Sequence, residues 1–120
     1  MKKFTVGDLL SKMKITNVSC CYRNSKIIKG HPEREIVAYT LGPYSGLIIG
    51  KKLDKKDTYF ACKFIINHYA YGNYKTGSFC GISISEALNE LHRFRMEGYK
   101  VELSKETEEK IRSSEFMRNI

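Results

Sequence analysis

The fold is decided by Asp57-Thr58-Tyr59-Phe60-Ala61-Cys62-Lys63-Phe64-Ile65-Ile66-Asn67-His68-Tyr69-Ala70-Tyr71, the pair Gly72-Asn73 and the arm that starts at Tyr74. Aromatic and β-branched residues are typical of strands, and a Gly-Asn pair between two such runs favours a tight turn. Side chains alternate along a strand. One face of the first arm therefore carries an apolar set fit for a core: Phe60, Cys62, Phe64 and Ile66. The other face suits a wet or partner-covered surface: Tyr59, Ala61, Lys63, Ile65, Asn67, Tyr69 and Tyr71. The stretch predicts a long hairpin over 57–84.

A helix and a returning strand follow the hairpin. Ser83-Ile84-Ser85-Glu86 has the spacing of a capping box, which predicts a helix start at this point. Gly98 stands where a residue of positive φ favours a helix end. Tyr99 to Leu103 alternates apolar and charged residues, as a half-buried strand does. Between the two ends, the following residues form one apolar stripe at helical spacing: Ala87, Leu88, Leu91 and Phe94. We expect this helix, over 84–97, to cover one face of the sheet.

The remaining segments complete an α+β fold. The pattern predicts a short helix near 4–14, strands near 15–22, 35–41 and 47–49, and a last helix that begins at Ser104. We therefore predict a single small domain over 1–120, with an antiparallel sheet of about five strands built on the 57–84 hairpin, the 84–97 helix packed on one face and short terminal helices. The apolar face of the last helix is thin, so 104–120 either forms a loosely attached tail or docks on a partner.

Positive charge is concentrated in the first half of the chain. The 120 residues carry a net charge of +8. Residues 1–60 hold 12 basic and 5 acidic residues, whereas residues 61–120 hold 9 and 8. This asymmetry indicates a polyanionic or acidic partner, with a merely soluble lysine-rich surface as the plain alternative.

The cysteines and the N-terminus predict a cytoplasmic protein. Met1-Lys2-Lys3 resembles the start of a secretory signal, but Gly7 and Asp8 interrupt the apolar run that such a signal needs. No run approaches the ~20 apolar residues of a membrane span. We therefore expect no membrane association and reduced thiols at the four cysteines, Cys20, Cys21, Cys62 and Cys80.

Motifs that would indicate catalysis are weak. The sequence has no Cys-x-x-Cys pair, and Cys20 and Cys21 are adjacent in a predicted strand, so no metal site is expected. Cys62 and His68 share a face of the hairpin but stand ~20 Å apart along it. Cys80 could lie nearer to His68 across the hairpin. A Cys/His enzyme is thus a minor alternative, and we predict a non-enzymatic protein without a cofactor.

The strongest functional pattern combines tyrosines, which can stack on bases, with lysines, which can follow phosphates. It predicts a small basic protein that contacts nucleic acid or a nucleoprotein. The candidate binding residues are Lys51, Lys52, Lys55, Lys56, Tyr59, Lys63, Tyr69, Tyr71, Tyr74 and Lys75. The second arm lacks the aromatic spacing of an RNA-recognition motif.

The composition, rich in Lys, Ile, Asn and Tyr and free of Trp, also fits an alternative. This is an inhibitor encoded by a phage or mobile element, which docks on an acidic host (defence) protein or sequesters a small anionic ligand.

Overall fold

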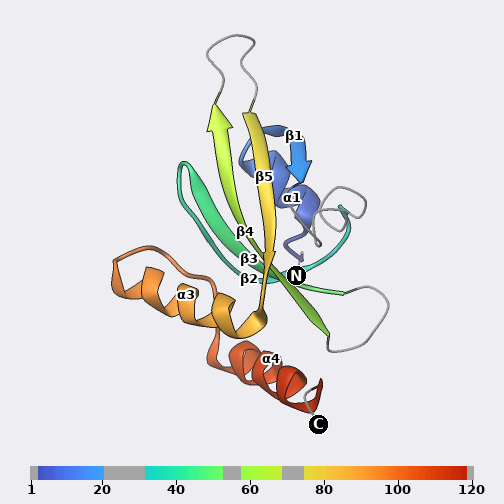
Figure 1. The fold of residues 1–120 in the computed structure, drawn as a ribbon, viewed down its shortest axis with the longest axis vertical. Helices are drawn as coiled ribbons and strands as arrows, with labels where there is room; N and C mark the ends of the chain where they lie inside the picture. The colour runs from blue at the N-terminus through green and yellow to red at the C-terminus, as the bar shows by residue number, and fades with distance from the viewer. Residues whose placement is uncertain (1–2, 21–31, 53–57, 69–74, 119–120) are drawn as a thin grey trace.

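A five-stranded mixed sheet forms the centre of the molecule (Figure 1). The computed structural model describes residues 3–20, 32–52, 58–68 and 75–118. In chain order the described elements are α1 (Val6–Lys12), β1 (Ile15–Cys20), β2 (Ile36–Leu41), β3 (Ser45–Lys51), β4 (Tyr59–His68), β5 (Lys75–Ile82), α3 (Ile84–Met96) and α4 (Lys105–Arg118). The predicted α+β class and five-stranded sheet are confirmed.

The sheet has the order β1-β5-β4-β3-β2. Strands β2 to β5 pair antiparallel, as predicted, whereas β1 lies parallel to β5 at one edge. The prediction of a wholly antiparallel sheet is therefore wrong at β1. Alternation along 15–22 predicts a strand but not its neighbour. The pairing of Cys20 with Phe79 joins strands far apart in sequence, with β2, β3 and β4 lying between them along the chain.

The predicted hairpin is present as β4 and β5, and its turn at 69–74 lies outside the described residues. Phe64 of β4 pairs with Phe79 of β5, and their rings stack with centroids 5.0 Å apart. The expected apolar face of β4 is confirmed, since all four of its members are at most 3% exposed: Phe60, Cys62, Phe64 and Ile66.

Helix α1 covers this apolar face. Thr5 begins the helix with a capping box, in which its hydroxyl accepts from the Asp8 amide at 3.2 Å and its amide donates to the Asp8 carboxylate at 3.0 Å. Val6 and Leu9 are fully buried and pack in the same core as the apolar face of β4. The amide of Val6 also donates to the carbonyl of Arg34 at 2.9 Å, so the segment before β2 holds the start of α1.

Helices α3 and α4 cover the opposite face, at the end of the sheet where β5 leads into α3 (Figure 1). Helix α3 begins as predicted, because the Ser83 hydroxyl accepts from the Glu86 amide at 3.1 Å. It ends before Gly98, which has a φ of 94°. The buried residues on this face form the second core of the molecule, and Ile111 of α4 is fully buried in it. The described part of α4 thus packs on the sheet side of the molecule through Ile111.

The segment from Tyr99 to Leu103 differs from its prediction. It makes an isolated bridge to the edge of β2, in which Tyr39 and Glu102 exchange backbone hydrogen bonds of 3.0 and 2.9 Å. The Thr40 hydroxyl donates to the carbonyl of Lys100 at 2.8 Å. The segment thus pairs with β2 at a single bridge and does not form a full strand. These hydrogen bonds to β2 fix the positions of Tyr99 and Lys100.

Candidate functional site

Several predicted binding residues lie outside the described residues, and their role stays a prediction. These residues are Lys55, Lys56, Tyr69, Tyr71 and Tyr74. The other predicted residues have described positions: Lys51, Lys52, Tyr59, Lys63 and Lys75.

The predicted wet face of β4 is only partly exposed. Lys63, Ile65 and Asn67 are exposed as expected. Tyr59 and Ala61 are only 4% and 1% exposed, because α3 and α4 cover this end of the strand. The ring of Tyr59 packs in the second core, so the expectation of an exposed stacking ring at this position is wrong.

The described lysines of the prediction point in different directions. Lys63 opposes Cys80 across the hairpin, and Lys75 stands five positions before Cys80 on β5. Because strand side chains alternate, Lys63 and Lys75 project from opposite faces of the sheet. Lys63 lies 4.0 Å from Glu90 of α3, and Lys51 lies 3.5 Å from Glu35. The amide of Lys52 closes the connection to β4 by donating to the carbonyl of Thr58 at 2.9 Å.

Two other tyrosines form the clearest exposed aromatic site in the described structure. Tyr44 is 66% exposed in the turn between β2 and β3, and Tyr99 is 47% exposed just after α3. The Tyr99 ring meets Phe94 edge-to-face, with centroids 5.4 Å apart. We call the hollow that these three rings share, of about 120 Å³, the ring pocket. Its lining is Thr40, Gly42, Pro43, Tyr44, Ser45, Gly46, Phe94 and Tyr99.

Local backbone bonds hold both tyrosines in place. The amide of Gly42 donates to the carbonyl of Ser45 at 2.8 Å, which closes the turn. The carbonyl of Tyr44 accepts from the amide of Ile66 on β4 at 2.7 Å, so the turn is tied to the centre of the sheet. After Gly98 reverses the chain, the amide of Tyr99 donates to the carbonyl of Phe94 at 3.0 Å. The rings therefore stand on a fixed backbone, which lowers the entropy lost on binding.

A second hollow lies beside the first and carries lysines. Its volume of about 360 Å³ is at the lower end of the range for ligand sites, which begins near 300 Å³. Both hollows are lined by Gly42 and Pro43, so they adjoin at this turn. We call the second hollow the lysine pocket, and its lining is Lys12, Met13, Tyr39, Leu41, Gly42, Pro43, Lys100 and Glu102. Apolar walls with a few charged groups suit a ligand that is part ring and part anion.

The charges at the lysine pocket are unevenly paired. Lys100 lies 3.3 Å from Glu102, with its side chain 88% exposed. None of the ion pairs among the described residues involves Lys12, which ends α1. The lining thus contains two lysines and one carboxylate, so the pocket has an excess of positive charge.

Cys62 is not suited to nucleophilic chemistry. Burial, with a smaller contribution from Cys80, raises the pKa of the Cys62 thiol to about 12. The thiol is therefore protonated at neutral pH, whereas a nucleophile needs the thiolate.

Within the described ranges, no cluster of three or more His, Cys, Asp or Glu side chains is arranged to hold a metal ion. Among those same residues, no helix has the length and apolar character to cross a membrane.

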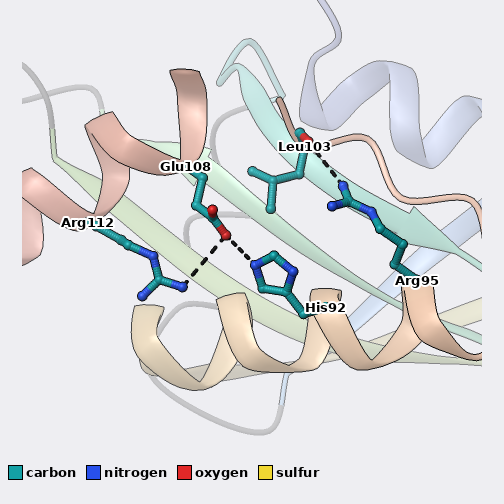
Figure 2. A network of polar contacts seen from close by, with 5 residues as sticks. All are labelled: His92, Arg95, Leu103, Glu108 and Arg112. Carbon is teal, nitrogen blue, oxygen red and sulfur yellow. Dashed lines mark hydrogen bonds and ion pairs between the residues drawn. The ribbon is translucent and has the colours of Figure 1, made fainter. Parts of the chain in front are cut away.

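A polar network joins α3 to α4 (Figure 2). His92 Nε2 donates to the carboxylate of Glu108, and Arg112 Nη2 lies 3.6 Å from the same carboxylate. Arg95 donates to the carbonyl of Leu103 at 3.1 Å, which holds the connection between the helices. Ile111, the residue before Arg112, is buried, so the network and this apolar contact both connect α4 to the rest of the fold.

Glu108→Gln is expected to remove part of the pH dependence of stability. The hydrogen bond from His92 is the main cause that lowers the pKa of Glu108; burial opposes it, and the charges of His92 and Arg112 add to it. A carboxylate with a depressed folded-state pKa stabilises the fold above its unfolded pKa of about 4.3. This contribution is lost as pH falls through the lower folded value. Urea unfolding across pH should show the wild type losing its advantage over the variant below about pH 4. A difference that stays constant down to acid pH would contradict this role.

Sequence reasoning missed Tyr44 and Tyr99 as binding residues. The sequence does contain a signal for both, because residues at turns are usually exposed. Tyr44 lies in the turn Gly42-Pro43-Tyr44-Ser45, and Tyr99 directly follows Gly98. Their approach to one another depends on where α3 lies, which no local pattern specifies.

No protein-family model matches the chain, and no curated protein or solved structure matches it.

Proposed function

We propose that the protein is a small basic protein that binds nucleic acid through a surface of lysines and tyrosines, without catalysis. The observation that supports this most is the pair of exposed rings, Tyr44 and Tyr99, beside a pocket lined by Lys12 and Lys100. Exposed rings offer stacking surfaces to bases, and lysines attract phosphates. The described structure thus offers this combination at the turn between β2 and β3.

The overall charge supports the same proposal. A net charge of +8 on 120 residues draws a polyanion toward the protein from beyond contact distance. Most of this charge comes from residues 1–60, which include Lys12 and the strands β2 and β3 that flank the turn. The proposal includes a cytoplasmic location, where thiols such as the free Cys62 stay reduced.

Binding is expected to weaken steeply with salt. Each lysine–phosphate contact releases counterions, so two to three contacts on a single strand predict a fall in affinity of about tenfold between about 50 and about 200 mM salt. Fluorescence anisotropy with short labelled RNA and DNA strands measures this slope. The control is the same titration with an uncharged peptide nucleic acid, which should bind more weakly and with no dependence on salt. If neither RNA nor DNA bound at low salt, the proposed function would be wrong.

A further inference from the structure

We infer that the two pockets form one site for an unpaired nucleic-acid strand, with a base in the ring pocket and an adjoining phosphate between Lys12 and Lys100. This inference rests on the proposed nucleic-acid binding, and it adds the class of strand and the place where it binds. The ring pocket supplies Tyr44, Phe94 and Tyr99, and the lysine pocket lies across Gly42 and Pro43. A base and its own phosphate are covalently joined, so adjoining pockets for a ring and for an anion match a nucleotide.

The geometry favours an unpaired strand over a duplex. In a duplex both faces of each base are stacked on neighbouring bases, so no face is available to a protein ring. The ring pocket, at about 120 Å³, has room for one flat group and not for a helix of two strands. Tyr44 and Tyr99 come from different elements whose backbones are fixed by hydrogen bonds. They can therefore receive an extruded base without rearrangement of the sheet.

Glu102 gives the inference a sharp test. Its carboxylate lies 3.3 Å from Lys100 and lines the pocket where the phosphate would lie. Exposed ion pairs are weak, so Lys100 can exchange this carboxylate for a phosphate. The remaining carboxylate would still repel the phosphate. Removing its charge should consequently favour the strand, without disturbing the backbone bridge between Glu102 and Tyr39.

Glu102→Gln is expected to tighten binding of a single-stranded oligonucleotide by about threefold, the size of one exposed charge interaction. Glu106→Gln is the matched control, because Glu106 is also exposed and paired with a lysine, Lys110 at 3.7 Å, but it lies on α4. Both variants raise the net charge equally. A gain of affinity cannot result from misfolding. An equal effect of the two variants, or no gain in Glu102→Gln, would overturn the inference.

The role of the rings is tested with strands that lack bases. Tyr99→Ala and Tyr44→Ala should each weaken binding of a normal single strand by about tenfold, the effect of losing one base–ring stack. They should leave binding of an abasic strand of the same length unchanged. Tyr99→Phe should retain the wild-type affinity, because it keeps the ring. If the alanine variants weakened both strands equally, or neither, the base would not lie in the ring pocket.

The outcomes separate this inference from the proposed function. If no strand of any kind binds at low salt, the proposed function fails. If strands bind but duplex binds as tightly as single strand, or if the Glu102, Tyr44 and Tyr99 variants behave as the wild type, this inference alone fails. Competition by poly-glutamate at the same charge concentration, with equal strength, would show that the site takes an acidic protein and would also overturn it.

Discussion

Phe64→Ala is expected to lower the free energy of unfolding by about 3–5 kcal/mol, the usual effect of deleting a buried aromatic ring. The Phe64 ring is 1% exposed and stacks on Phe79 across the hairpin. It also fills the space over Gly46, where an added Cβ would come within 2.4 Å of the ring. Loss of the ring would leave a cavity in the core between the sheet and α1. Urea denaturation monitored by circular dichroism measures the change.

Ile65→Ala is the matched control for Phe64→Ala. Ile65 is the next residue of β4 but faces the other way and is 59% exposed, so its truncation should change stability by about 0.5 kcal/mol or less. A double-mutant cycle adds a second check. Gly46→Ala should destabilise the wild type more than it destabilises Phe64→Ala, because part of its clash is with the ring. Equal losses from Phe64→Ala and Ile65→Ala would contradict the observed register of the hairpin.

Ile111→Ala is expected to cost about 2–5 kcal/mol and to expose α4 to proteases. Ile111 on α4 is fully buried and belongs to the core beneath α3. Lys110→Ala is the adjacent control; it removes only the exposed contact with Glu106, which is worth ~0.2–0.5 kcal/mol. Unfolding by urea and limited proteolysis together measure both effects. If Ile111→Ala behaved like Lys110→Ala, residues 104–118 would be a loosely attached tail.

The features that could be predicted from the sequence are those fixed by local chemistry. The apolar face of β4, the cap at Ser83 and the helix end at Gly98 each follow from residues close in sequence. Alternation correctly sorts β4 into two faces. It does not say which parts of a face are covered, and Tyr59 is therefore buried where an exposed ring was expected.

The features that could not be predicted depend on contacts between distant segments. The parallel pairing of β1 with β5 and the contact of His92 with Glu108 join residues that no local pattern relates. The candidate site has the same character. Tyr44 lies in a turn, Tyr99 follows a helix, and only the position of α3 against the sheet brings them to one pocket. Composition predicted a surface that carries lysines and tyrosines. The sequence pattern favours the hairpin as the location of this surface, because the tyrosines are most closely spaced there.

Titration of isotope-labelled protein with an unpaired oligonucleotide, followed by the NMR shifts of backbone amides, tests the central claim most directly. Each amide reports on its own surroundings, so the binding surface is located without mutation. We predict saturable shifts at low salt for Gly42, Tyr44, Tyr99 and Lys100, with one common Kd, and no shifts for the exposed side of α4. Absent shifts, or shifts confined to residues remote from the turn between β2 and β3, would contradict the account.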